Sequence, residues 1–250
     1  MTATTSPAAL GVAFQGCACR AAFHAGVAEG LAERGVVPRW TAGASSGSLV
    51  AAALAAGLGR SLPAMWRSLG GRSVVSLRRT LWNRSPFDMS HIVRTTLRAH
   101  LGAGDLREHP TEALVVATRL RGMRRVVFSS RDEPDLVEPL LASCFIPVLY
   151  GRPVRVRGEL YVDGGATDNL PIEELASRGA RDVIAVVASA DGVVLKDLRR
   201  RRWTPGLHGA NLVLVRPRRA LAIGSWDFDR DRMERAIEEG HAAVREAWGS

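Results

Sequence analysis

The first sixty residues alternate short apolar runs with segments of helical periodicity, and this alternation constrains the fold more than any other feature of the sequence. The apolar run Leu10–Phe14 precedes a helical stretch, Ala21–Arg34, in which apolar side chains recur every fourth residue. Trp40–Ala42 is a second short run, and Ser46–Ala56 is an alanine-rich helical segment followed by a glycine. Strands and helices in alternation are typical of an α/β protein with a parallel sheet.

The rest of the chain continues this pattern with less regularity. The strands that we expect there are 113–118, 125–128, 154–156, 159–162, 182–187 and 212–215, and the expected helices are 63–69, 88–101, 136–142 and 231–248. No repeat, low-complexity tract or clear linker divides the sequence. We therefore predict a mainly parallel central sheet with helices on both faces, in a single domain over residues 9–248 after a disordered N-terminus, residues 1–8.

Composition excludes several classes of protein. No window of 18 residues is uniformly apolar, and the N-terminus lacks the basic start and apolar run of a secretory signal. Three cysteines cannot form a disulfide framework, so we expect a reduced, cytoplasmic protein. The net charge of +9 suits nucleic acid, anionic lipid or acidic substrates. Because no nucleic-acid module is present and only 6% of residues are aromatic, we expect no nucleic-acid partner.

The sharpest local signal is the segment Gly43-Ala44-Ser45-Ser46-Gly47, a G-x-S-x-G motif between an expected strand and an expected helix. In that context the glycines Gly43 and Gly47 permit a tight turn that exposes the serine, and the next helix directs its positive end toward the hydroxyl. A plain strand–helix turn of small residues has the same pattern. Ser45 is therefore a candidate nucleophile.

A serine nucleophile needs a base, and the usual order places an acid and then a histidine downstream of it. His208, in a loop at 205–209, is the only reasonable candidate for such a triad. The other downstream histidines fit surface or packing positions: His91, His100, His109 and His241.

A carboxylate followed by two glycines, Asp163-Gly164-Gly165, comes directly after the expected strand 159–162. A carboxylate at the end of a strand can face a cleft, although Asp-Gly is also a strong turn signal. Further on, Asn169 and Pro171 are placed to cap and open a helix.

The loop that joins the first strand to the first helix contains Gly16, Cys17, Ala18, Cys19 and Arg20. Backbone amides at such a junction can bind an oxyanion. The loop lacks the G-x-G-x-x-G pattern of a dinucleotide site. A C-x-C pair without a second cluster is a weak metal signal, so small buried cysteines are the better interpretation.

The sequence resembles the patatin-like phospholipase family in the order and spacing of three motifs: the loop at 14–24, the segment 43–47 and the Asp-Gly-Gly segment. The segments 142–147, 168–171 and 228–243 are also similar to that family, so the resemblance covers nearly the whole chain. It implies a patatin-like α/β/α sandwich and a serine acyl hydrolase of the lipase or phospholipase A type, without a metal or organic cofactor.

By this resemblance, Ser45 is the nucleophile and Asp163 the base of a dyad that uses no histidine. Ser45 would attack an acyl ester and form an acyl-enzyme, which water would hydrolyse. Amides of the loop 16–19 would hold the oxyanion, the Ser46 amide would add to them, and Arg20 would brace the loop. The implied partner is a lipid or another acyl-ester substrate.

The sequence departs from the family where Cys17 and Ala18 replace two glycines of the loop and Ala21 replaces a third. A side chain at a position with positive φ costs about 1 kcal/mol, and losing one oxyanion donor costs roughly 10²–10³ in rate. Three alternatives to hydrolysis by the dyad therefore stay open: an acyltransferase with the same dyad, a weakly active module that binds lipid or a protein, and a triad that uses His208.

Arginine and tryptophan are interspersed over residues 60–84, which suits peripheral contact with an anionic membrane as well as a solvated helical cap. A second basic run, Arg199–Trp203, suits the same kind of contact or a plain solvated loop. The sequence determines neither the headgroup and chain length of the substrate nor the oligomeric state.

Overall fold

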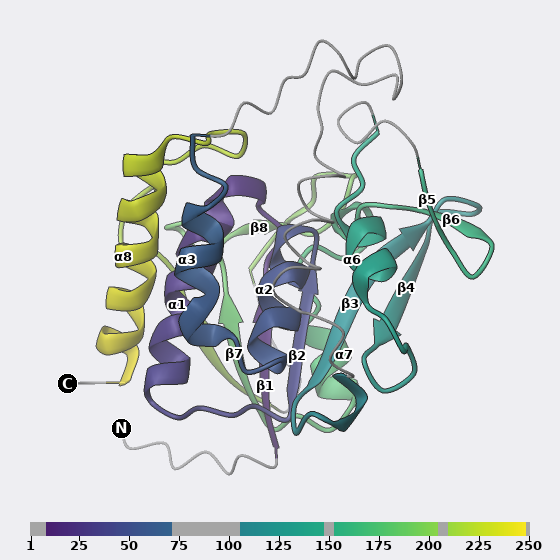
Figure 1. The fold of residues 1–250 in the computed structure, drawn as a ribbon, viewed down its shortest axis with the longest axis horizontal. Coiled ribbons are helices and arrows are strands. Elements are labelled where there is room, and N and C mark those ends of the chain that lie inside the picture. Colours follow the sequence, from purple (N-terminus) through teal and green to yellow (C-terminus); the bar gives the residue numbers. More distant parts are fainter. Residues whose placement is uncertain (1–8, 72–105, 148–152, 205–209, 249–250) are drawn as a thin grey trace.

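The computed structural model describes residues 9–71, 106–147, 153–204 and 210–248, and an eight-stranded sheet runs through them (Figure 1). Its strands are β1 Leu10–Phe14, β2 Trp40–Ala44, β3 Glu112–Arg119, β4 Arg124–Ser129, β5 Val154–Val156, β6 Glu159–Val162, β7 Asp182–Val186 and β10 Asn211–Val215. The helices around it are α1 Ala22–Glu33, α2 Ser46–Ala55, α3 Leu62–Arg67, α6 Val137–Ser143, α7 Ile172–Ser177 and α8 Arg230–Trp248.

Five neighbouring strands of the sheet, in the order β10-β7-β1-β2-β3, are parallel throughout. Strands β4 and β6 pair with β3 in antiparallel orientation, and β5 pairs with β6. The sheet is therefore mixed but mostly parallel, as the sequence predicts, and the expected hairpin at 154–162 forms its far edge.

Strand β3 fixes the relative position of β2 and β6. Ala44, the last residue of β2, pairs with Val116, whereas Val162, the last residue of β6, pairs with Thr118. Strand β4 pairs with the same two residues of β3 and so occupies the other edge. Because β2 runs parallel to β3 and β6 runs antiparallel, the two strands approach each other head-on. The residues that follow each strand therefore emerge at the same place.

Helices cover both faces of the sheet, as predicted. Val12 and Phe14 of β1 point to one face, where they pack with α1, α2, α3 and α8. The intervening Ala13 points to the other face and packs with α7. Helix α6 packs with β3, β5 and β6 in a third cluster. Figure 1 shows α1, α3 and α8 grouped together on one side of the sheet.

The basic run 199–203 is a solvated loop only in part: its exposed residues 199–201 lie in the turn of a hairpin, whose strands are β8 Val194–Leu195 and β9 Arg202–Trp203. One local prediction is wrong. Asn169 does not cap α7: the residue before the helix is Pro171, and no side chain caps it.

Several sequence predictions lie outside the described residues. They are the disordered segment 1–8, the helix 88–101, His91, His100 and His208, and the basic segment beyond residue 71. In the described part of the chain, no helix combines the length and the apolar character needed to cross a bilayer.

Candidate active site

Ser45 lies in the sharp turn between β2 and α2, with the left-handed backbone angle φ = 52°. The two glycines of the motif allow this turn through close backbone approach. A Cβ atom on Gly43 would lie 2.4 Å from the carbonyl of Gly47, and a Cβ atom on Gly47 would lie 2.4 Å from the carbonyl oxygen of Phe14. Only glycine fits at either position, so the motif builds the strained turn that its sequence predicts.

Hydrogen bonds from two other serines hold the backbone of Ser45. Its amide donates to Ser143 Oγ at 2.9 Å, and Ser143 Oγ donates to the Val116 carbonyl at 2.6 Å. Ser48 Oγ donates to the Ser45 carbonyl at 2.6 Å. Sequence reasoning assigned no role to Ser143, and its position in the family-like segment 142–147 was the only signal that pointed to it.

Asp163 directly follows β6 and is fixed at three atoms. Its amide donates to the Phe145 carbonyl at 2.8 Å, its carbonyl accepts from Thr118 Oγ1 at 2.9 Å, and its Oδ1 accepts from the Gly165 amide at 2.7 Å. The next residue, Gly164, sits so close to β3 that a Cβ atom there would lie 2.1 Å from the Val116 carbonyl oxygen. The Asp-Gly-Gly segment therefore packs closely against β3 at Val116, the residue that pairs with Ala44 directly before Ser45.

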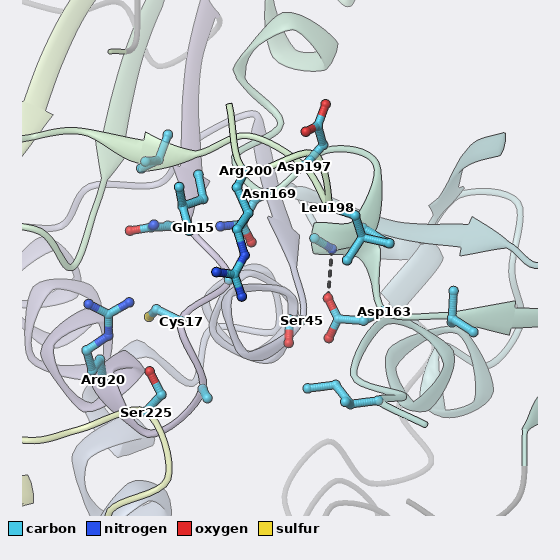
Figure 2. Close-up of a pocket in the computed structure, with 18 of the residues that line it drawn as sticks. Gln15, Cys17, Arg20, Ser45, Asp163, Asn169, Asp197, Leu198, Arg200 and Ser225 are labelled. Atoms are coloured by element: carbon cyan, nitrogen blue, oxygen red, sulfur yellow. Dashed lines mark hydrogen bonds between the residues drawn. The ribbon is translucent and has the colours of Figure 1, made fainter. Parts of the chain in front are cut away.

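Ser45 and Asp163 line the same cavity, and Figure 2 shows their side chains next to each other. The second carboxylate oxygen, Oδ2, is buried and accepts no hydrogen bond from the described residues. Burial raises the pKa of Asp163 to about 6, while the Ser45 hydroxyl and the Gly165 amide lower it. The carboxylate is therefore largely ionised at neutral pH and keeps one oxygen free to accept a proton.

Most amides of the loop 16–20 already have protein acceptors. Gly16 donates to the Asn169 carbonyl, Cys17 to Ser46 Oγ at 3.1 Å, Cys19 to the Ser225 carbonyl and Arg20 to the Cys17 carbonyl. The Ala18 amide has no acceptor among the described residues, and Ala18 lines the cavity. Of this loop, Ala18 therefore offers the amide that is free to bind an oxyanion.

The expected strain of the loop falls on one residue. Ala18 has φ = 53°, in the left-handed region. Ala21 has φ = −67° and belongs to a regular 3₁₀ turn, Ala18–Ala21, so its side chain causes no strain. Cys17 has φ = −152°, which any residue adopts.

The Cys17 thiol lies 3.8 Å from Nε2 of His24, and both side chains are buried. Burial raises the pKa of Cys17 to about 12 and lowers the pKa of His24 to about 3, with the charge of Arg20 adding to the second shift. Both groups are therefore neutral at physiological pH. Arg20 also lines the cavity, and its buried Nε finds no hydrogen-bond partner in the described part of the chain.

The cavity has a volume of about 970 Å³, which suits a drug-sized or acyl-chain ligand. One part of its wall is apolar, formed by Leu120, Met123, Phe145, Ile146, Pro147 and Val162. No histidine from the described residues lines it, and His241 instead pairs with Glu33 at 2.6 Å. The described residues also contain no group of three His, Cys, Asp or Glu side chains that could hold a metal ion.

An ion pair between buried Asp168 and partly exposed Arg125 supports the segment that follows the Asp-Gly-Gly motif. Asp168 accepts from Arg125 Nε of β4 at 2.7 Å, and Arg125 also reaches Glu174 of α7 at 3.0 Å. The carbonyl of Asn169 accepts from the Gly16 amide at 3.0 Å, and its amide donates to the Lys196 carbonyl at 2.9 Å. This short stretch therefore connects the loop 16–20, the carboxylate segment and the β8–β9 hairpin.

Comparison with known proteins identifies relatives of the chain. The family model for patatin-like phospholipase matches residues 12–176. Human patatin-like phospholipase domain-containing protein 2 is 35% identical over 174 residues, which cover 66% of this chain and 34% of the human protein. The human protein described as 1-acylglycerol-3-phosphate O-acyltransferase PNPLA3 is 29% identical, over 64% of this chain and 34% of its own. The chain thus spans about a third of the length of these two relatives.

Among solved structures, the crystal structure of VipD from Legionella pneumophila has a similar fold, with a TM-score of 0.56. The alignment covers 98% of this chain and 67% of VipD at 13% identity. At that level of identity the similarity concerns the fold alone.

Proposed function

The chain belongs to the patatin-like phospholipase family, and on that basis we propose that it is a serine acyl hydrolase that cleaves acyl esters of lipids. Ser45 acts as the nucleophile and Asp163 as its base. One observation carries the assignment: the two side chains follow different strands, yet they line one cavity in which Asp163 Oδ2 has no partner among the described residues.

In the first step, Asp163 Oδ2 takes the proton of the Ser45 hydroxyl while Oγ attacks the ester carbonyl carbon. The carbonyl π electrons move to oxygen, and the free amide of Ala18 stabilises that oxyanion together with the amide of Ser46. The tetrahedral intermediate then expels the alcohol oxygen, which takes the proton back from Asp163. The products are an acyl-enzyme on Ser45 and a free alcohol.

In the second step, water replaces the alcohol. Asp163 accepts a proton from the water, the oxygen of the water attacks the acyl carbonyl, and the bond to Ser45 Oγ breaks as Oγ regains a proton. A fatty acid leaves and the enzyme is restored. The Gly165 amide keeps Oδ1 fixed throughout, so Oδ2 stays directed toward the serine.

Transfer of the acyl group to another alcohol is the second candidate function. It differs only in the acceptor that enters after the first alcohol leaves, and the acyltransferase named among the relatives favours it. An excess of a lysolipid or glycerol acceptor separates the two reactions, because a transferase forms a new ester where a hydrolase releases fatty acid.

The further parts of this proposal concern organisation and location. Residues 9–248 form one catalytic domain. The protein works in the cytoplasm and contacts anionic membranes peripherally. It needs neither a metal nor an organic cofactor, since the dyad and the amides supply every group that the two steps use.

Turnover of a short p-nitrophenyl ester tests the proposal, with Ser45→Ala and Asp163→Asn as the diagnostic variants. Each should lower kcat/KM by at least about 10³-fold with folding unchanged. His208→Ala is the control that separates the dyad from a triad, and it should retain activity. Loss of activity in His208→Ala, or full activity in Asp163→Asn, would contradict the dyad.

A further inference from the structure

Large apolar side chains that remain exposed gather at one place on the described surface. Those with the greatest exposure include Leu198, which is 66% exposed, and Trp226, which is 51% exposed. Five of the seven such residues also line the cavity that contains Ser45, and we call these five the cavity rim: Leu120, Met123, Leu195, Leu198 and Trp226. Because each is both exposed and part of the cavity wall, they lie where the cavity opens to solvent. An apolar gathering of this kind marks an interaction surface.

The cavity rim comes from three separate segments of the chain. Leu120 and Met123 lie in the turn between β3 and β4, Leu195 and Leu198 belong to the β8–β9 hairpin, and Trp226 lies in the loop before α8. In Figure 2, Leu198 lies above Asp163. The Leu198 amide donates to the Ala166 carbonyl at 3.1 Å, so the hairpin is attached to the segment that carries the carboxylate.

Positive charge accompanies two of the three segments of the cavity rim. Four exposed arginines in or beside the β3–β4 turn and the β8–β9 hairpin form no ion pair with the described residues: Arg121, Arg124, Arg199 and Arg200. The acidic groups of the same wall are already paired, since Asp197 binds Arg201 at 2.6 Å and Asp191 binds Arg202 at 3.1 Å. The opening of the cavity therefore combines the apolar side chains of the cavity rim with guanidinium groups that form no ion pair with the described residues.

We propose that the cavity rim docks the protein onto an anionic lipid surface, with the mouth of the cavity facing the lipid. This proposal rests on the proposed hydrolysis of lipid esters and identifies the face through which the substrate enters. Apolar tips enter the acyl region while the arginines stay at the headgroups and meet their negative charge. A lipid molecule then reaches Ser45 without crossing water.

A lipid surface explains this arrangement better than a protein partner does. The apolar side chains of the cavity rim come from three separate segments and stand among long arginines, rather than along one helix or strand that a peptide could follow. The same tips can each enter a fluid layer independently. The cavity rim shares no residue with the basic segment 60–84, so the two can be tested separately.

Vesicle binding of the full chain tests the proposal in a Ser45→Ala background, where no lipid is consumed. The expected result is binding to vesicles of phosphatidylcholine with 30% phosphatidylglycerol, and at least tenfold weaker binding to phosphatidylcholine alone. Leu198→Asp with Trp226→Asp should weaken binding to the anionic vesicles at least tenfold. Val37→Asp is the matched control, because Val37 is 53% exposed but does not line the cavity.

A labelled variant keeps the test informative if the double variant fails to fold. An environment-sensitive dye on Leu198→Cys should shift its emission to the blue on anionic vesicles, and the same dye on Val37→Cys should not. The three natural cysteines are buried and leave the introduced thiol as the reactive one. Three results would overturn the proposal: equal emission shifts of the two dyes, no binding to the vesicles, or a stable dimer of the protein that covers Leu198.

The vesicle assay in the Ser45→Ala background involves no turnover, so its result does not depend on the proposed hydrolysis. Loss of vesicle binding with intact ester hydrolysis would reject the docking face alone. Vesicle binding without any ester hydrolysis by the unmodified chain would reject the hydrolase and leave a lipid-binding module.

Discussion

Ser45 and Asp163 each follow the last residue of a strand, and those two strands run toward each other along one edge of β3. Their meeting point is fixed by backbone pairing rather than by side-chain packing. Val116 of β3 contacts the support of both residues. Its carbonyl oxygen accepts a hydrogen bond from Ser143, which holds the Ser45 amide, and it also lies against Gly164, which follows Asp163. The geometry of the dyad is therefore a property of the sheet.

The first prediction concerns the pH dependence of catalysis. A base must be ionised to accept a proton, and burial raises the pKa of Asp163 to about 6. We expect kcat/KM for a short ester to rise with pH through about 6 and to level off above 7. A profile of rate against pH, with folding monitored across the range, checks this. A plateau that already begins at pH 5 would show an unperturbed carboxylate.

The second prediction concerns stability and follows from the same shift. The pKa of Asp163 is higher in the folded state than in the unfolded state, so folding favours the protonated carboxyl. This contribution to the free energy of unfolding is fully present below about pH 4 and is lost as the pH rises through about 6. Asp163→Asn should therefore stabilise the fold by about 1–3 kcal/mol above pH 7. Denaturant unfolding at pH 7.5 and pH 4 measures the difference, which should vanish at the lower pH.

The third prediction concerns the strained loop. Ala18→Gly should stabilise the protein by about 1 kcal/mol, because glycine adopts φ = 53° without a steric cost. Ala21→Gly is the matched control and should destabilise by about 0.5–1 kcal/mol, since Ala21 has helical angles. Thermal unfolding compares the two variants. Equal effects of both would mean that the strain does not lie at Ala18.

The fourth prediction concerns the support of the carboxylate segment. Asp168 is almost fully buried and pairs with Arg125, so Asp168→Ala leaves a partly buried cation without this partner. We expect a loss of about 2–4 kcal/mol in unfolding free energy and a lower kcat. Glu246→Gln breaks an exposed ion pair with Arg218 and should cost less than about 1 kcal/mol. Denaturant unfolding and ester turnover measure both variants.

The regular part of the fold was predictable because buried strands and amphipathic helices carry a periodic pattern. The hairpin of β8 and β9 was not, since strands of two residues are too short to show any period. The role of Asn169 was also missed. Its sequence position suits a helix cap, but its backbone joins Gly16 to Lys196, and that long-range pairing leaves no local signal.

The two candidate catalytic residues differ in how far the sequence points to them. Ser45 lies in a motif whose two glycines are needed because Gly43 and Gly47 approach each other too closely for a side chain. Asp163 is part of an ordinary turn pattern, and only the family resemblance distinguished it from a turn. The loop amide at Ala18, which has no acceptor among the described residues, could not be inferred, because its freedom depends on which acceptors the fold brings to the neighbouring amides.

The central claim is that Asp163 activates Ser45, and covalent labelling by a fluorophosphonate tests it most directly. The reagent needs an activated serine and no substrate specificity, and peptide mass spectrometry locates the adduct. We predict one adduct on Ser45, formed at least about 10²-fold more slowly in Asp163→Asn. An adduct on another serine, or equal labelling rates with and without the Asp163 carboxylate, would contradict the account.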